Sequence, residues 1–141
     1  MADLKSLIRL RKHGVEERQK VIAALYRDIE VLEEKREMFK QRLEDERKVF
    51  EEQTSMDMKP YFGMFQERIN NNIKAIGGHI SKLEARLRIL QDDLRDAFAD
   101  MKRVEIVQRN REAEARNKEN KKETGELDEI GIEVFRRKED V

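Results

Sequence analysis

Apolar residues at alternating four- and three-residue spacing form two long seams in this chain. The first seam covers fourteen core positions between Leu4 and Phe50, of which ten are apolar: Leu4, Ile8, Val15, Ile22, Leu25, Ile29, Leu32, Phe39, Leu43 and Phe50. The second is unbroken over eleven positions: Ile69, Ile73, Ile76, Ile80, Leu83, Leu87, Leu90, Leu94, Ala97, Met101 and Val104. This spacing places one narrow apolar stripe along a helix and is typical of coiled coils. It predicts an all-α chain with two long, paired helices.

The chain's only proline, Pro60, lies between the two seams. Because proline suits the first turn of a helix and not its interior, the seams belong to two helices that fold back on each other. If Lys59-Pro60 is the point of reversal, Phe50 faces Ile69 and Ile29 faces Leu90. The sequence thus predicts a single antiparallel two-helix coiled-coil hairpin over residues 1–141. Its expected parts are a first arm at about 3–53, a turn at about 54–63, a second arm at about 60–120 and an amphipathic tail at about 125–138.

Four charged residues interrupt the first seam, namely Arg11, Arg18, Arg36 and Glu46. In the expected register each of the last three faces an apolar residue of the second arm: Arg18 faces Met101, Arg36 faces Leu83 and Glu46 faces Ile73. Long charged side chains can lie along apolar neighbours while their heads reach water. We interpret these positions as register control, because a polar core residue penalises slipped pairings.

The ends of the expected hairpin differ in character. Six methionine and aromatic residues crowd the bend, and they either seal the seam or form a contact surface: Met56, Met58, Tyr61, Phe62, Met64 and Phe65. Beyond Val104 the second seam gives way to charged residues. After Gly125, the apolar residues Leu127, Ile130, Val134 and Phe135 have no obvious partner within the chain.

The composition argues against catalysis and nucleic-acid binding. Lys plus Arg number 31, Asp plus Glu also 31, and the two signs alternate instead of forming a basic stripe. The 38% hydrophobic residues against 44% charged ones leave too little to wall a substrate pocket, and no catalytic, phosphate-binding or metal-binding motif occurs. No cysteine is present, the two histidines lie far apart in the expected register, and no segment has membrane-spanning length. We therefore expect no cofactor, no metal, no membrane insertion and a cytoplasmic location.

The chain resembles the FliJ family, the coiled-coil component of the bacterial flagellar type III export apparatus. The resemblance lies in the plan of two long helices, a charged stretch and an acidic-then-basic end, Glu126-Leu127-Asp128-Glu129 followed by Arg136-Arg137-Lys138. It implies a non-enzymatic stalk or adaptor, peripheral at the inner membrane, that binds the export ATPase and the export-gate membrane protein and assists export chaperones. It also implies similarity to the central-stalk subunit of rotary ATPases, whose terminal helices enter a hexameric ring.

Two groups of candidate contact residues follow from this resemblance. The ATPase contact is expected at the open end, where apolar side chains accompany basic ones: Leu4, Leu7, Ile8, Arg11, Ile130, Val134, Phe135, Arg136 and Arg137. The gate contact is expected near the bend: Met38, Tyr61, Phe62, Phe65 and His79. Two alternatives stay open, a stalk or chaperone of a virulence-type secretion system and an inert coiled-coil spacer.

Overall fold

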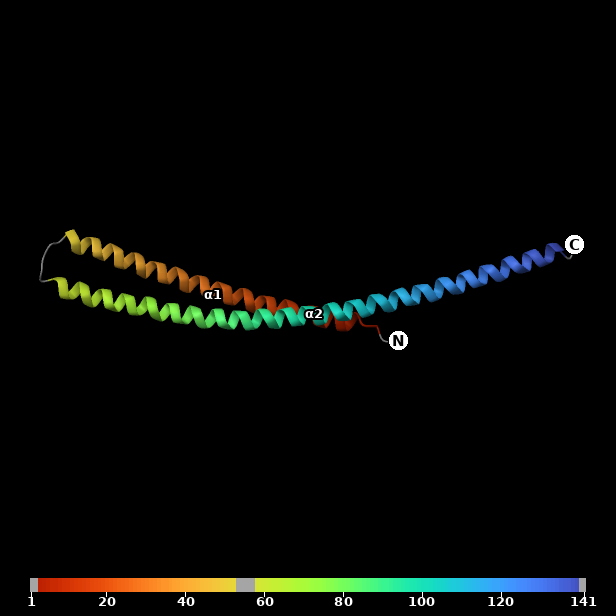
Figure 1. The fold of residues 1–141 in the computed structure, drawn as a ribbon, viewed down its shortest axis with the longest axis horizontal. Coiled ribbons are helices and arrows are strands. Elements are labelled where there is room, and N and C mark those ends of the chain that lie inside the picture. The colour runs from red at the N-terminus through yellow and green to blue at the C-terminus, as the bar shows by residue number, and fades with distance from the viewer. Residues whose placement is uncertain (1–2, 53–57, 140–141) are drawn as a thin grey trace. The chain divides into compact units, whose positions relative to one another are not determined.

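Two long helices make up the computed structural model, which describes residues 3–52 and 58–139 (Figure 1). Helix α1 spans Lys5–Glu52 and helix α2 spans Lys59–Glu139, and the described residues contain no strand. The predicted all-α class with a two-helix hairpin is confirmed. Pro60 lies in the first turn of α2, where its missing N–H leaves no hydrogen bond unmade. Residues 53–57, which include much of the predicted turn and Met56, lie outside the described residues.

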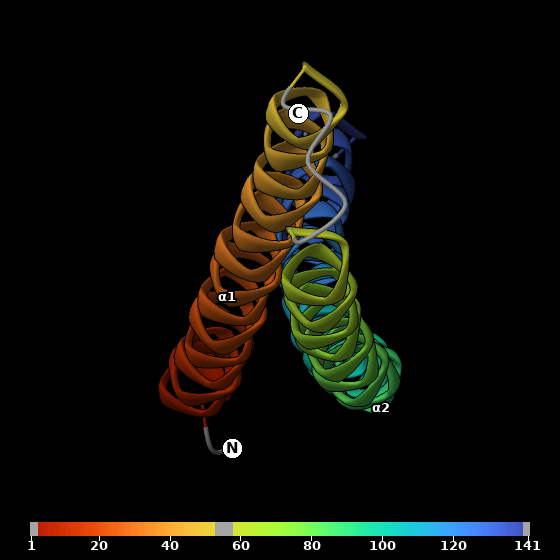
Figure 2. The same ribbon diagram turned by 90° about the vertical axis from the view of Figure 1, so that its left-hand side faces the viewer.

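The chain divides into two compact units. The hairpin unit is Gly14–Asp96, and the terminal unit combines Met1–His13 with Ala97–Val141. Within the hairpin unit α1 and α2 run side by side in opposite directions, as the two views in Figures 1 and 2 agree. α2 is one continuous helix through the predicted second arm and tail.

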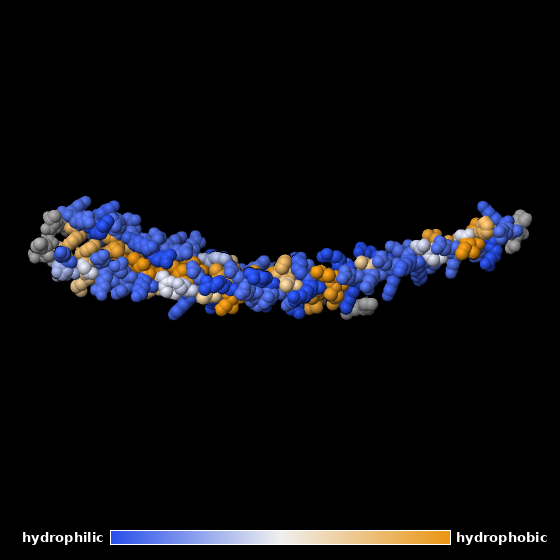
Figure 3. Space-filling model, in the orientation of Figure 1, coloured by the Kyte–Doolittle hydropathy of each residue, from blue (hydrophilic) through white to orange (hydrophobic). Residues whose placement is uncertain are grey.

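The core of the hairpin unit consists of the predicted seam residues. Ile22, Leu25 and Ile29 of α1 form one cluster with Ile76, Ile80 and Leu87 of α2, all nine-tenths or more buried. Half-buried neighbours extend this cluster along both helices: Leu32, Phe39, Leu83, Leu90 and Leu94. Figure 3 shows the apolar line between the hydrophilic outer faces of the unit. Burial of this stripe is what holds the helices together, because propensity alone contributes little to such a charged pair.

The predicted pairing register is wrong by one heptad. Phe50 does not face Ile69 but stacks on Phe62, seven residues earlier in α2, with ring centroids 4.9 Å apart. The Arg36 guanidinium lies beside Gly77, six residues before its predicted partner Leu83, and Leu90 lines a groove with Val21, eight residues before its predicted partner Ile29. The terminal unit shows the same offset: the predicted register would place Gln108 opposite Arg11, whereas Gln108 accepts a hydrogen bond from the backbone of Leu4, seven residues earlier.

The physical reason lies in the placement of Pro60. A proline in the first helical turn marks where α2 begins, so the chain reverses before it and not at it. Moving the point of reversal back by half a heptad shifts the facing partner of every α1 residue by a full heptad. Because the apolar pattern repeats every seven residues, the same residues fill the seam in either register. The seam was therefore predictable, whereas its pairing was not.

The charged core positions other than Arg36 keep their charged groups near water in the observed register. Arg18 donates from Nε to Asp93 Oδ2 at 2.9 Å, and also from its guanidinium to the Gly14 carbonyl at 3.1 Å. Both Arg18 and Asp93 side chains are more than 40% exposed, so this ion pair contributes little to stability. Glu46 is exposed, whereas Arg36 is half-buried and its Nε is fully buried without a hydrogen-bond partner.

Leu90→Ala is expected to lower the free energy of unfolding by roughly 2–4 kcal/mol, because Leu90 packs against the core cluster. Leu127→Ala is the matched control, since Leu127 is 68% exposed on the same helix and its loss should be nearly neutral. Urea unfolding followed by circular dichroism measures both variants. Equal losses for both would contradict the assignment of the core to the seam.

Candidate partner-binding surfaces

A groove of about 310 Å³ lies at the end of the hairpin unit near the bend, and we call it the turn-end groove. Its lining comes from both helices: Glu46, Val49, Phe50, Met58, Tyr61, Phe62 and Phe65. Phe50 and Phe62 stack nearly parallel, with 12° between their planes, and close the seam beneath the groove. The guanidinium carbon of Arg42 lies 5.7 Å from the centroid of the Phe65 ring, a cation–π distance that helps to fix this half-buried ring.

Three of the five candidate gate residues, Tyr61, Phe62 and Phe65, share this groove. Met38, with 72% of its surface exposed, and the exposed His79 do not line it. His79 is fourteen residues beyond Phe65 on α2, which corresponds to about 21 Å at the helical rise. Glu46, Val49 and Phe50 also line the groove but were not among the candidate gate residues, because their place beside Tyr61 and Phe62 follows only from the observed register.

In the terminal unit, Gln108 of α2 forms hydrogen bonds with the residues that precede α1. The Leu4 N–H donates to Gln108 Oε1 at 3.1 Å, and Gln108 Nε2 donates to Asp3 Oδ1 at 3.2 Å and Glu112 Oε1 at 3.0 Å. Leu4, Leu7 and Ile8 are half-buried here, and Arg11 is exposed. An open groove of about 340 Å³ adjoins Gln108, with a mostly charged lining: Asp3, Arg111, Glu112, Glu114, Ala115 and Lys118.

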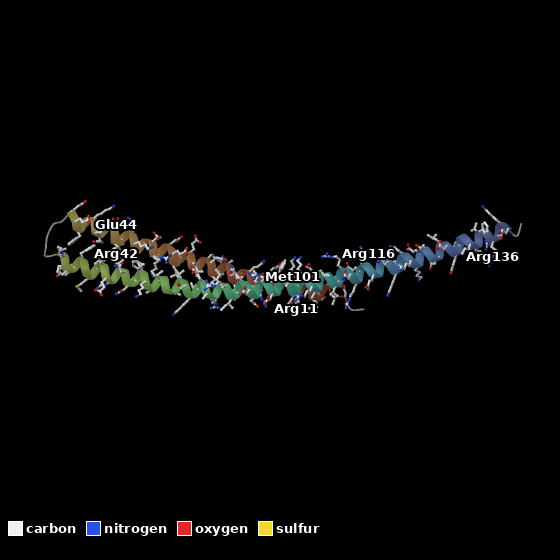
Figure 4. All side chains as sticks on the ribbon, viewed as in Figure 1. Arg11, Arg42, Glu44, Met101, Arg116 and Arg136 are labelled. Carbon is white, nitrogen blue, oxygen red and sulfur yellow. The ribbon has the colours of Figure 1, made fainter. Side chains whose placement is uncertain are left out.

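Beyond these hydrogen bonds α2 continues as a single exposed helix, seen between Arg116 and Arg136 in Figure 4. Every residue from Glu114 to Glu139 is exposed. Five large apolar side chains there are 50–68% exposed, one of them Ile132. The other four form what we call the terminal strip: Leu127, Ile130, Val134 and Phe135. The basic residues Arg136, Arg137 and Lys138 occupy the last turn, where positive charge is favourable to the helix dipole.

The candidate ATPase residues thus fall into two separate groups. Leu4 is bonded to Gln108, whereas Ile130 lies twenty-two residues farther along α2, about 33 Å at the helical rise. The first group belongs to the paired helices, because three of its four members are half-buried. All members of the second group are exposed: Ile130, Val134, Phe135, Arg136 and Arg137. Arg137 makes a 3.5 Å ion pair with Glu133.

The grouping of the titratable side chains and their pKa values bear on metal binding and catalysis. Among residues 3–52 and 58–139 no three histidine or carboxylate side chains are grouped to hold a metal ion. The Glu44 carboxylate, which accepts a hydrogen bond from Arg47, raises the pKa of Arg47 above its ordinary value, an effect that only keeps an exposed arginine charged. No helix within the described ranges is long and apolar enough to cross a bilayer.

Two paired helices with a heptad seam define a coiled-coil protein. The family model of the flagellar FliJ protein matches residues 1–140, and the chain therefore belongs to the FliJ family. It is thus a component of the flagellar protein export apparatus, in a family that is non-catalytic. The comparisons with curated proteins and with solved structures returned no match.

Proposed function

We propose that the chain is a stalk or adaptor that couples the export ATPase to the export gate and assists export chaperones. In this role it resides in the cytoplasm and is held at the inner membrane through the apparatus. The observation that carries the proposal is the exposure of the four large apolar residues of the terminal strip on a segment of α2 that is rich in charge and packs against no second helix. Such a set on a charged helix is typical of a contact surface awaiting a partner.

The terminal strip suits the ATPase. Its apolar side chains can enter a groove between helices of a ring, and Arg136 and Arg137 can pair with carboxylates that line it. Such contacts gain energy because the strip leaves water on binding, whereas the free helix has no burial to lose.

The turn-end groove suits the gate. Tyr61 is 70% exposed and Met58 is 45% exposed, so both offer apolar area without leaving the core. Aromatic residues and methionine are favoured in protein interfaces because they bring large or adaptable contact area. The groove and the strip belong to different units, which gives one protein two separable contacts.

Capture with the tagged chain in its native cell, followed by ATP hydrolysis assays with the purified hit, tests the proposal. The expected hit is the flagellar export ATPase, with hydrolysis stimulated by the chain. A matched variant, Ile130→Asp with Phe135→Asp, should lose both capture and stimulation while staying folded. Capture of a virulence-type ATPase instead would favour the alternative apparatus, and capture unchanged by the variant would contradict the role of the strip.

A further inference from the structure

The seam of the hairpin unit fits two registers almost equally well. In the observed register, set by the Phe50–Phe62 stack, the apolar core residues of α1 from Leu25 to Phe50 are opposite apolar residues of α2. If α2 slides along α1 by one heptad, each of these α1 residues is again opposite an apolar residue of α2. Leu25 exchanges Leu87 for Leu94, Ile29 exchanges Leu83 for Leu90, and Leu43 exchanges Ile69 for Ile76. Ile22, which also belongs to the core cluster, would exchange Leu90 for the smaller Ala97, so the shifted state keeps most of the apolar burial that holds the unit together.

The observed register leaves one group unsatisfied, and the slide would supply its partner. Arg36 Nε is buried without a hydrogen-bond partner, and its guanidinium lies beside Gly77, which offers no side chain. A donor left unpaired in this way costs stability. Seven residues after Gly77 comes Glu84, which is exposed in the observed register. In the shifted register its carboxylate would take the place of Gly77 beside Arg36.

In the described part of the hairpin unit, the contacts that favour the observed register include the Phe50–Phe62 stack, the Arg42–Phe65 cation–π contact, the exposed Arg18–Asp93 ion pair and a 2.8 Å hydrogen bond from Gln91 to Tyr26. In the terminal unit, the slide would also break the hydrogen bonds that join Gln108 to Leu4 and Asp3. Exposed pairs of this kind contribute little individually. Within the hairpin unit the two states accordingly differ by a small free energy, and the Phe50–Phe62 stack makes the largest contribution to this difference.

We propose that the hairpin unit is a two-register switch, in which α2 slides along α1 by one heptad, about 10 Å. The shifted state breaks the Phe50–Phe62 stack, since Phe50 would meet Ile69, and so frees Phe62 at the turn-end groove. A partner that binds Phe62 without Phe50 selects the shifted state, because a ligand stabilises the state it binds better. Register and occupancy of the groove are thereby coupled.

Disulfide trapping in the purified full chain tests the switch, because the sequence contains no cysteine. Three pairs share Ile29→Cys and differ only in the second site: Leu83→Cys matches the observed register, Leu90→Cys matches the shifted one, and Leu94→Cys matches neither. A disulfide needs Cα atoms within about 7 Å, whereas one heptad is about 10 Å, so the Leu83 and Leu90 pairs each report one register. Leu94 is four residues, about 6 Å, beyond Leu90, and faces Ile29 in neither register. All three α2 sites are half-buried, which makes the pairs comparable.

The Leu83 pair should close fully, and the Leu90 pair should close about 10- to 100-fold more slowly, as expected for a minor state populated at about 1–10%. The Leu94 pair, which is offset from the facing position by about 6 Å along the axis even in the shifted register, should be slower still. Gly77→Glu supplies a carboxylate to Arg36 in the observed register and should slow the Leu90 pair, as should Glu84→Ala. Gly77→Ala, which adds only a methyl group 3.9 Å from Arg36, is the control and should leave the ratio of the Leu90 rate to the Leu83 rate unchanged.

Closure of the Leu90 pair no faster than that of the Leu94 pair would overturn the switch. So would a Leu90 rate unchanged by both Gly77→Glu and Glu84→Ala, because the Arg36 partner would then play no part. Circular dichroism of the reduced variants shows that each is folded before oxidation. These outcomes do not involve the ATPase or the gate, so they stand apart from the proposed function.

Discussion

Truncation after Gly125 is expected to abolish stimulation of the export ATPase while leaving the hairpin folded. The removed segment carries the whole terminal strip, whose side chains are 50–68% exposed and contribute no core. Its residues are not part of the core cluster, so the free energy of unfolding of the hairpin should change by no more than about 0.5 kcal/mol. ATP hydrolysis by the purified ATPase and swimming motility measure the loss.

Paired point variants separate the apolar and basic contributions of the strip. Ile130→Asp with Phe135→Asp should lose stimulation at any salt concentration, since it removes apolar contact area. Arg136→Glu with Arg137→Glu should lose affinity mainly at low salt, because screening already weakens exposed charge pairs at high salt. Asn117→Asp, on the same exposed helix but outside the strip, is the control and should behave as the parent. Full motility of cells that express the truncated chain at the normal level would contradict the assignment of the terminal strip to the ATPase contact.

The seams were predictable because a heptad pattern is a local property of the chain. Ile22, Ile80 and Leu87 are buried where the spacing places them, and no distant contact is needed to define them. The register is a different matter, since it depends on where the chain reverses. Pro60 indicates the start of a helix and not an apex, and a half-heptad error at the bend becomes a full heptad in every facing pair.

The candidate surfaces were predictable in kind and not in extent. Exposure of Ile130 and Phe135 follows from apolar residues that continue after the seam ends, and the structure places both in water. The separation of Leu4 from Ile130 could not be inferred, because no spacing rule indicated that α2 runs unbroken to Glu139. Likewise Val49 joins the groove only through the correct register. The pairing of residues across two helices is a tertiary property, and a sequence that repeats every seven residues is compatible with more than one register.

Tyr61→Ala combined with Phe65→Ala is expected to weaken binding of the export gate at least about tenfold, because aromatic anchors dominate interface energies. Tyr61 is 70% exposed and Phe65 half-buried against Arg42, so the core cluster stays intact. Binding of the chain to the cytoplasmic part of the gate by calorimetry, with ATPase stimulation measured in parallel, reports the effect. Stimulation should persist, since the terminal strip is untouched.

Controls within the same hairpin distinguish the turn-end groove from the two candidates outside it. Met38→Ala and His79→Ala remove exposed side chains that do not line the groove, and each should bind the gate as the parent does. Phe62→Ala is a different case, because it also removes the stack on Phe50 that closes the seam. If it weakens the hairpin yet retains gate affinity, Phe62 acts in the seam alone. Gate binding lost in His79→Ala but kept in the Tyr61 and Phe65 double variant would move the contact away from the groove and along α2, toward Gly77 and Gly78.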